Sequence, residues 1–312
     1  MLFSKGLASP ILVHPRVRPD ALAYRTAKRR LGYEIEIRPM TEADLGQMHQ
    51  LSIGVGWPHR PEDWRLVMGV GQGFVACDAI GRALGSAMWW PFGDDFATVG
   101  MVITSPRLQA QGSGRQLMEV IFAQSGDRDL RLSATKAGYR LYRALGFEPI
   151  GRIFQHQGRN VQLPSPPPAM PGLRAAVPSD LASLIRLDTS AYGAPRDRVI
   201  TALMEASAGT VIEREGEIAG FALCRPFGRG HVVGPIVAED DEMAIALVAP
   251  HVEMHEGGFL RADTAQEQGR FGAFLESCGM TIYDSVTPMI RGRHHAPGGA
   301  ARTFGLANQA LG

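Results

Sequence analysis

Gln109-Ala110-Gln111-Gly112-Ser113-Gly114 is the stretch that decides the fold, together with the residues on either side of it. The apolar run from Val99 to Thr104 precedes it and predicts a buried strand, which Pro106 ends. Behind it, apolar residues recur at helical spacing from Leu117 onward. A glycine-rich turn between a strand and a helix presents unpaired backbone N–H groups at the positive end of the helix dipole. The stretch therefore predicts a phosphate-binding site.

The same stretch resembles the pyrophosphate loop of the GNAT acyltransferases, whose usual form is Val-x-Pro-x-x-Gln/Arg-x-x-Gly-x-Gly/Ala. Thr104 stands where valine is common. Residues 135–147 resemble the family's Asn-x-x-Ala-x-x-Leu-Tyr-x-x-x-Gly-Phe helix, with Thr135 and Gly138 in place of the asparagine and the alanine. The resemblance covers residues 34–158, and the P-loop and dinucleotide-binding motifs fit the sequence less well.

This resemblance implies that acetyl-CoA binds as the acyl-donor substrate. The backbone of Val102, Ile103 and Thr104 would bind the pantetheine arm, and the loop 109–114 would bind the pyrophosphate. Arg115 could add a charged contact to a phosphate, or it could be a solvated helix residue. Thr135 stands where the family's asparagine would bond to the cofactor.

Tyr142 is the catalytic candidate. When an amine attacks the thioester, the departing thiolate needs a proton, and a phenol with a pKa of about 10 could donate it. The alternative is an aromatic core residue that packs beside Leu145 on the same helix. Tyr139, one turn earlier, has the same two interpretations.

The sequence leaves the general base open. Asp94 and Asp95 follow a hairpin and could face the acceptor, but Phe-Gly-Asp-Asp is also typical of a polar turn, which we favour. His59, in the loop 53–61, could be a base, an acceptor contact or a surface residue, and a water relay could replace all of these. Four tryptophans could line an acceptor pocket, although core packing is the simpler interpretation: Trp57, Trp64, Trp89 and Trp90.

An internal repeat predicts two domains. Residues 81–93 align without gaps with residues 216–228, and six of the 13 positions are identical. Each copy predicts one hairpin, 74–78 with 83–90 and 210–213 with 218–224, and Thr41 and Ser179 predict the N-cap of its first helix. We expect an α/β fold of two tandem GNAT-like domains, each a mixed, mostly antiparallel sheet with helices on both faces.

The domain boundaries follow changes in composition. Residues 34–160 form the expected GNAT catalytic domain, 161–172 a Pro-rich linker, 173–292 a divergent GNAT-like domain and 293–312 a Gly/Pro-containing C-terminal tail. Residues 1–33 are basic, with Asp20 as the one acid before residue 31. They could be a transit peptide or a nucleic-acid arm, but a poorly ordered extension, or a start codon placed too far upstream, explains them as well.

The second copy lacks the residues that the chemistry needs. Four consecutive acids, residues 239–242, stand at the helix start where the first copy has glycines, and Leu275 stands at the position of Tyr142. Acids stabilise a helix N-terminus but repel a pyrophosphate. We expect the second domain not to be catalytic.

Composition excludes several other classes of protein. The chain has 32 Lys and Arg against 31 Asp and Glu, a net charge of +1, so no overall charge attracts nucleic acid or an anionic membrane. No apolar stretch reaches the roughly 18 residues of a membrane span. Three separated cysteines, Cys77, Cys224 and Cys278, indicate buried reduced thiols in a cytoplasmic protein, and neither they nor His294-His295 indicate a metal site.

The favoured function is transfer of an acyl group, above all acetyl from acetyl-CoA, to a primary amine by direct attack in a ternary complex. A small-molecule amine is the favoured acceptor, with a protein amine as the alternative. A non-catalytic acyl-CoA-binding sensor is the alternative function, and Tyr142 favours the enzyme. The sequence carries no signal for the oligomeric state.

Overall fold

The computed structural model of the chain describes residues 28–30, 33–105, 112–266, 269–295 and 297–312. The first half contains, in order, β1 (Lys28–Arg30), β2 (Tyr33–Pro39), the 3-10 turn η2 (Glu42–Asp44), α1 (Leu45–Gly54), α2 (Pro61–Val70), β3 (Gln72–Cys77), β4 (Ala83–Phe92), β5 (Phe96–Thr104), α3 (Ser113–Ser125), β6 (Asp129–Ala134), α4 (Tyr139–Ala144), β7 (Glu148–Pro149) and β8 (Ile153–Gly158).

The second half repeats the order from β2 to β8 without a counterpart of β7, and it adds one strand at its end. It contains β9 (Leu173–Ala175), the 3-10 turn η3 (Pro178–Asp180), α5 (Leu181–Tyr192), α6 (Asp197–Ala206), β10 (Ala208–Arg214), β11 (Glu217–Phe227), β12 (Gly230–Ala238), α7 (Asp241–Met254), β13 (Leu260–Thr264), α8 (Arg270–Ser277), β14 (Thr281–Arg291) and the additional β15 (Arg302–Gly305). Within the described residues, no helix combines the length and the apolar character needed to cross a membrane.

The strands form one hydrogen-bonded path that crosses from one half into the other. Its order is β1-β2-β3-β4-β5-β6-β14-β8-β13-β12-β11-β10-β9, with β7 paired to β14 and β15 paired to β12. The pairs β5–β6 and β12–β13 are parallel, and the other described pairs are antiparallel. The expected fold of two mixed, mostly antiparallel α/β domains is confirmed, and both predicted hairpins form, as β3–β4 and β10–β11.

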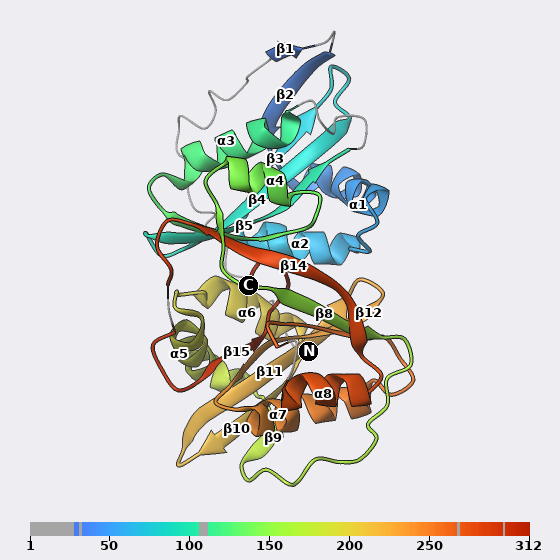
Figure 1. Cartoon of the computed structure of the whole chain (residues 1–312), viewed down its shortest axis with the longest axis vertical. Coiled ribbons are helices and arrows are strands. Elements are labelled where there is room, and N and C mark those ends of the chain that lie inside the picture. The colour runs from blue at the N-terminus through green and yellow to red at the C-terminus, as the bar shows by residue number, and fades with distance from the viewer. Residues whose placement is uncertain (1–27, 31–32, 106–111, 267–268, 296) are drawn as a thin grey trace, which may run out of the picture.

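The two halves exchange their last strands. β8, from the first half, pairs antiparallel with β13 of the second half, from Leu260↔Gly158 to Thr264↔Phe154. β14, from the second half, pairs antiparallel with β6 of the first half, from Thr287↔Ala134 to Arg291↔Leu130. Figure 1 shows the green β8 beside the yellow and orange strands of the lower half, and the red-orange β14 beside the upper half. Each sheet is therefore completed by a strand of the other repeat.

A shared hydrophobic core also joins the halves. One cluster of buried side chains contains Trp64 and Trp90 from the first half together with Leu184, Tyr192 and Phe221 from the second. Two further clusters lie on the outer sides, one under α3 and α4 and one under α7 and α8. The helices α2 and α6 contact each other between the halves. Burial of apolar surface, rather than a flexible hinge, therefore fixes how the halves are placed.

The start of each repeat is stabilised by the same ion pair. In the first half, Asp44 accepts from the backbone N–H of Thr41 at 2.8 Å and pairs with Arg38 at 2.6 Å. In the second, Asp180 pairs with Arg174 at 2.8 Å and accepts from the N–H of Val177 at 2.9 Å. Thr41 is the N-cap of the 3-10 turn η2 rather than of the amphipathic helix α1, whose N-cap is Asp44, and the N-cap prediction is wrong for Ser179, which lies inside η3. An aspartate three residues after the cap satisfies the N-terminal N–H, so the cap itself needs no hydroxyl.

Candidate active site

The strands β5 and β6 form a wedge in the first half. They pair in parallel from Phe96↔Asp129 to Val99↔Leu132, and then the pairing stops although β5 continues to Thr104. Next to this point, Met101 has a left-handed backbone with φ of 50°, and the register between β4 and β5 shifts. A bulge of this kind turns a strand away from its neighbour. Val102, Ile103 and Thr104 therefore lie on the diverging part of β5, where a pantetheine arm is expected.

The helix α3 begins beside the open end of this wedge. Its N-cap Gly112 has φ of 81°, a left-handed conformation that a side chain disfavours. A Cβ built on Gly114 would lie 3.2 Å from Leu141 Cδ2 and 3.6 Å from Thr104 Cγ2, so this glycine lets the helix start approach both α4 and β5. Ser113 is buried. The predicted contacts of Gln109, Ala110 and Gln111 lie outside the described residues.

Arg115 and Thr135 have local partners in the structure. The Arg115 guanidinium lies 4.0 Å from Glu119 and donates to the Ala144 carbonyl at 3.5 Å, while its side chain stays half exposed. The Thr135 hydroxyl accepts from the N–H of Gly138 at 3.3 Å, which caps the turn that leads into α4. Thr135 also lines the cavity described below. Thr135 therefore fixes the end of the wedge whether or not it contacts a cofactor.

Tyr142 is a buried residue of α4. Its ring packs edge-on against Phe147 with 6.0 Å between the ring centres, and a Cβ on Gly138 would overlap it. Burial raises the pKa of the phenol above its usual value, so the group keeps its proton at neutral pH. The core packing is therefore shown, and a protonated phenol is also what a general acid requires. Tyr139 is only partly buried and packs at the edge of the same cluster.

A cavity of about 300 Å³, which we call the acceptor cavity, opens next to Met101 and is lined by both halves. Its polar side chains include His59, Asp63, Gln155, Arg229 and Arg261. The first half contributes the loop after α1, and the second contributes the turn between β11 and β12 and part of β14. The C-terminal residues 308–310 complete the wall. The cavity thus depends on contacts that no single repeat could supply.

His59 faces this cavity, so the surface interpretation is wrong. Its Nδ1 lies 3.4 Å from the Ser52 hydroxyl, which accepts from the indole N–H of Trp64 at 2.7 Å. Its ring contacts Trp57 and Phe227 edge-on, with ring centres 5.7 and 5.5 Å away. Burial lowers the pKa of His59 to about 4, so the imidazole is neutral at pH 7. Base and acceptor contact both remain open for it.

The structure also shows which of the aspartate and tryptophan candidates line the acceptor cavity. Asp94 and Asp95 lie in a turn, outside the residues that line the acceptor cavity, and Asp94 approaches Arg128 at 3.6 Å. The preferred turn interpretation is therefore confirmed. Of the four tryptophans, Trp57 lines the cavity, whereas the core-packing interpretation is confirmed for the buried residues Trp64, Trp89 and Trp90.

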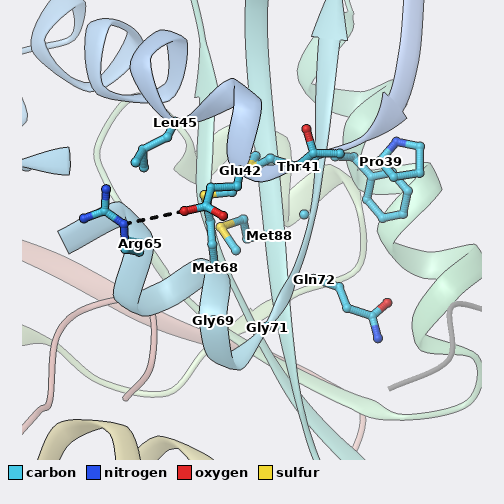
Figure 2. Close-up of a pocket in the computed structure, with 13 residues that line it drawn as sticks. Pro39, Thr41, Glu42, Leu45, Arg65, Met68, Gly69, Gly71, Gln72 and Met88 are labelled. Carbon is cyan, nitrogen blue, oxygen red and sulfur yellow. Dashed lines mark ion pairs between the residues drawn. The ribbon is translucent and has the colours of Figure 1, made fainter. Parts of the chain in front are cut away.

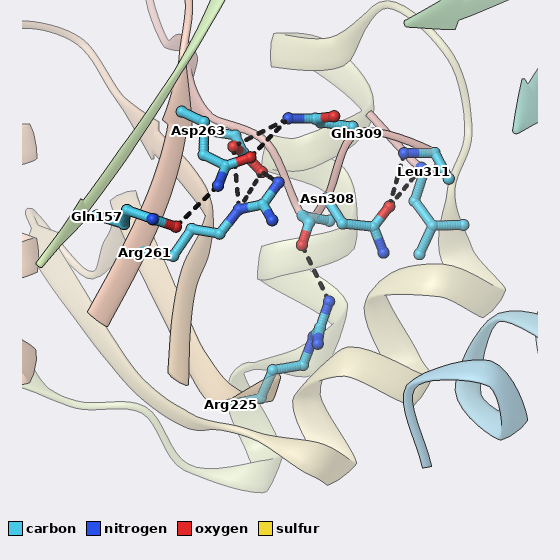
Figure 3. Close-up of polar contacts among 10 residues, drawn as sticks. Gln157, Arg225, Arg261, Asp263, Asn308, Gln309 and Leu311 are labelled. Carbon is cyan, nitrogen blue, oxygen red and sulfur yellow. Dashed lines mark hydrogen bonds and ion pairs between the residues drawn. The ribbon is translucent and has the colours of Figure 1, made fainter. Parts of the chain in front are cut away.

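The C-terminal segment is anchored by two arginines and its own turn. The Asn308 carboxamide oxygen accepts from the N–H groups of Ala310 and Leu311, both at 2.8 Å. Arg225 donates to the Ala307 carbonyl at 3.0 Å (Figure 3). The buried Arg196 donates to the Leu311 carbonyl, also at 3.0 Å. Sequence reasoning missed this wall because a Gly/Pro-containing tail gives no periodic signal. The asparagine, which caps the turn, is the one hint that the sequence holds.

The corresponding wedge of the second half is filled. Parallel pairing of β12 with β13 covers only His231↔Leu260 and Val232↔Arg261, and β15 pairs with the end of β12, from Ile236 to Ala238. The Leu306 N–H donates to the Asp263 carbonyl of β13 at 2.8 Å, so the tail lies between the two strands. At the start of α7, Asp240 accepts from the Met243 N–H at 2.8 Å. The protein's own chain thus occupies the groove and the helix N-terminus.

A further cavity lies away from this site. About 460 Å³ in volume, it is lined by apolar side chains such as Leu45, Met68 and Met88, with the Glu42–Arg65 pair, 3.9 Å apart, at one side (Figure 2). It shares no lining residue with the acceptor cavity. Among the described residues, no group of three or more His, Cys, Asp or Glu side chains is placed to hold a metal ion.

Comparison with known proteins identifies both halves. Residues 70–149 and 184–305 each match an acetyltransferase (GNAT) domain family. The uncharacterized N-acetyltransferase YitH of Bacillus subtilis (strain 168) is 25% identical over 285 residues, which cover 89% of this chain and 98% of YitH.

Solved structures share the fold. A provisionally assigned acetyltransferase from Pyrococcus horikoshii has a TM-score of 0.74 and 18% identity, covering 91% of this chain and 98% of its own. A GCN5-related N-acetyltransferase from Sphaerobacter thermophilus has a TM-score of 0.60 and 18% identity, over 85% and 96%. A tandem GNAT protein from the clavulanic acid biosynthesis pathway has a TM-score of 0.57 and 17% identity, over 84% and 100%.

Proposed function

Because the chain is an acetyltransferase with two tandem GNAT domains, we propose that it transfers acetyl from acetyl-CoA to the primary amine of a small molecule. The amine attacks the thioester directly while both substrates are bound, so the enzyme forms no covalent intermediate. The main support is the wedge between β5 and β6, which opens beside Met101 onto a cavity lined by both halves. Buried free thiols at Cys77, Cys224 and Cys278 fit a cytoplasmic location.

The donor side uses the start of α3 and the diverging part of β5. The pyrophosphate lies against Gly112, Ser113 and Gly114, where backbone N–H groups and the helix dipole favour an anion. Arg115 is near enough to this helix start to turn from Glu119 toward a phosphate. Val102 to Thr104 and Thr135 flank the pantetheine arm and the thioester.

On the acceptor side, the amine binds in the cavity, and the reaction needs a protonated Tyr142 and a neutral His59. Tyr142, which is not one of the residues that line the acceptor cavity, protonates the leaving thiolate. Its phenol carries the proton at neutral pH, and burial raises its pKa further, so the transfer must be driven by the negative charge that forms on the sulfur. His59 is neutral because burial lowers its pKa, so it can accept a hydrogen bond from the amine. The cavity volume of about 300 Å³ suits a small molecule better than a folded protein surface.

The second half binds no acetyl-CoA in this proposal. Its groove holds β15, and four acids, Glu239 to Glu242, stand at the helix start. Like charges about 4 Å apart repel by roughly 4 kcal/mol at an effective dielectric of 20. A diphosphate therefore meets both a filled groove and repulsion, and one chain binds one acetyl-CoA.

The test combines thiol release from acetyl-CoA with calorimetry of the full chain. A panel of primary amines should reveal turnover, whereas cofactor binding without turnover on any amine would indicate the sensor. Calorimetry should saturate near one equivalent of acetyl-CoA. Gly114→Asp should weaken this binding by roughly 100-fold, because it places a charge against the pyrophosphate.

Two variants isolate the effect of charge. Gly114→Ala adds the methyl group near Leu141 without a charge, and Gly46→Asp adds the charge at an exposed position of α1 with no heavy atom within 4 Å of the new Cβ. Both should keep acetyl-CoA affinity within a few-fold of the parent. Unchanged affinity in folded Gly114→Asp, or a second equivalent of bound acetyl-CoA, would overturn the assignment.

A further inference from the structure

We propose that Asp63 is a positioning residue, which holds a turn of the second half against the loop 55–60 and so sets the shape of the acceptor cavity. This inference rests on the proposed acyl transfer, because it concerns how the amine is held. The Asp63 carboxylate accepts from the backbone N–H of Gly228 at 2.9 Å, although the two residues are 165 positions apart in the sequence. Both residues line the acceptor cavity. The bond therefore joins the two halves at the place where the amine is expected to bind.

Asp63 also has a local role at the start of α2. Its carboxylate accepts from the backbone N–H of Arg60 at 2.8 Å and pairs with the Arg60 guanidinium, also at 2.8 Å. Burial by itself would raise the pKa of this carboxyl, but the hydrogen bonds from Arg60 and Gly228 lower it, so the group is ionised at neutral pH. Hydrogen bonds to an ionised acceptor are stronger than those between neutral groups. One carboxylate thus fixes the start of α2 and the turn between β11 and β12 together.

The turn at Gly228 lies directly against the loop that carries His59. Gly228 has φ of 56°, and a Cβ built on it would lie 3.3 Å from the carbonyl oxygen of Pro58. The preceding residue, Phe227, contacts His59 edge-on, with the ring centres 5.5 Å apart. Glycine permits both this left-handed conformation and the close approach. A shift of the turn would therefore move groups on two walls of the acceptor cavity.

The other repeat separates this role from helix capping and from the close approach of the turn. Gly93 corresponds to Gly228 in the gap-free alignment, and it also has a positive φ, of 70°. A Cβ on Gly93 would lie 3.4 Å from Pro195 Cγ, in the loop between α5 and α6. Each turn thus approaches the loop between two helices of the opposite half. The third residue of α6, however, is Val199, whereas the third residue of α2 is Asp63. The carboxylate is therefore added to this contact in the repeat whose loop lines the acceptor cavity.

The first experiment compares Asp63→Ala with Asp44→Ala in the full chain, by steady-state kinetics with the best amine of the panel and by calorimetry with acetyl-CoA. Asp44 is the matched control, because it makes the same kind of cap and ion pair, with Thr41 and Arg38, inside the first half. Both variants should lower the melting temperature. Asp63→Ala alone should raise the KM for the amine by about tenfold or more, with the Kd for acetyl-CoA within a few-fold of the parent. Asp63→Asn keeps an oxygen that can accept from Gly228, so it should recover most of the lost KM.

A second readout, acrylamide quenching of tryptophan fluorescence, needs no turnover. Trp57 lines the acceptor cavity and is partly exposed, whereas the other three tryptophans are buried. Release of the loop 55–60 should therefore increase quenching in Asp63→Ala but not in Asp44→Ala. Gly228→Ala places a methyl group against the same loop and should also increase both quenching and the KM for the amine. Gly93→Ala makes the equivalent change in the other repeat and should leave both values near those of the parent.

The results separate this proposal from the proposed function. A parent protein that turns over no amine would contradict the acyl transfer, and quenching would still test the bond between Asp63 and Gly228. Quenching in Asp63→Ala and Gly228→Ala that equals the quenching in their controls would overturn the positioning role. An increase in quenching without an increase in KM would overturn it as well, because the loop would then move without affecting the amine. If Asp63→Ala does not fold, the pair Gly228→Ala and Gly93→Ala decides the question.

Discussion

Tyr142 is a core residue, and in the proposed mechanism it is also the general acid. The ring belongs to the hydrophobic cluster under α3 and α4, and the hydroxyl remains protonated because burial disfavours the phenolate. A sequence motif identifies the residue but does not separate these two roles. A substitution that keeps the ring and removes the hydroxyl separates the packing role from the chemical role.

Tyr142→Phe should lower kcat by roughly 10² to 10⁴, the usual contribution of a positioned acid. The affinity for acetyl-CoA should stay near that of the parent, because the packing against Phe147 is preserved. Steady-state kinetics and calorimetry on the same preparation measure both quantities, and Tyr139→Phe is the matched control. A kcat within a few-fold of the parent would leave Tyr142 with its structural role alone.

The half-buried His59 and the buried His251 should make the protein less stable in mild acid. Burial lowers the pKa values of His59 and His251 to about 4, whereas both should have pKa values of about 6.5 in the unfolded chain. As the pH falls from 6.5 toward 4, the unfolded state binds protons that the folded state does not, so the free energy of unfolding decreases. Each histidine should account for on the order of 3 kcal/mol over this range.

Denaturant unfolding at a series of pH values between about 4.5 and 6.5 measures this slope. That window lies above the range in which Asp44, Asp63, Asp129 and Asp180, whose pKa values are lowered, lose their contribution. His59→Gln or His251→Gln should each flatten the slope, and exposed His294→Gln should not. An equal slope in all four proteins would mean that neither His59 nor His251 resists protonation.

At the scale of elements, each repeat contains a wedge between two diverging strands, and one wedge is open whereas the other is filled. In the first half β5 and β6 diverge next to an accessible cavity, and in the second β12 and β13 diverge around β15. The acids at 239–242 predict that the second helix start is unsuited to a pyrophosphate, and in the structure Asp240 caps this helix start itself. The strand that fills the groove was not predicted, because Arg302-Thr303-Phe304-Gly305 is short and follows a stretch rich in Gly and Pro.

The turn at the end of the chain should control the shape of the acceptor cavity. A Cβ on Gly100 would lie 2.6 Å from the Ala310 Cβ, so Gly100→Ala should push residues 308–312 away from β5. The KM for the amine should then rise more than the Kd for acetyl-CoA. Steady-state kinetics with the best amine of the panel measures the change.

Ala310→Gly in the same chain provides the control, since it removes the methyl group that the new Cβ meets. The double variant should recover part of the lost affinity for the amine, because the Ala310 Cα and the Trp90 ring remain close, at 3.0 and 3.2 Å. If Ala310→Gly gives no recovery, the turn does not shape the cavity in the way that its position indicates.

At the scale of the molecule, the exchanged strands and the shared core should make the chain unfold as one unit. All four tryptophans lie in the first half, so their fluorescence reports that half, while far-ultraviolet circular dichroism reports both. In urea the two signals should give the same midpoint. A fluorescence midpoint displaced from that of the dichroism by more than the fitting error would show that the halves unfold separately.

The sequence predicts the order of elements well and their partners less well. Hairpins such as β3–β4 follow from alternating apolar residues around a short turn, and Gly112 and Gly114 locate the helix start. The destinations of β8 and β14 do not follow, because a strand has the same pattern whichever sheet it enters. Residues that reach the acceptor cavity through this exchange or through the tail, such as Gln155 and Asn308, are therefore beyond local reasoning.

The exchanged strand β14 also determines when the first half can complete its sheet during synthesis on the ribosome. The edge of β6, which ends at Ala134, receives this partner only after Thr281 to Arg291 have been made. At a synthesis rate of about 5 to 20 residues per second, the wait is roughly 10 to 30 s. During that time the nascent first half exposes an unpaired strand edge next to an apolar face, which is a typical surface for misassociation. Synthesis of β14 is thus the step that covers the exposed edge of β6. Slowing translation before Thr281 should therefore lower the yield of soluble protein.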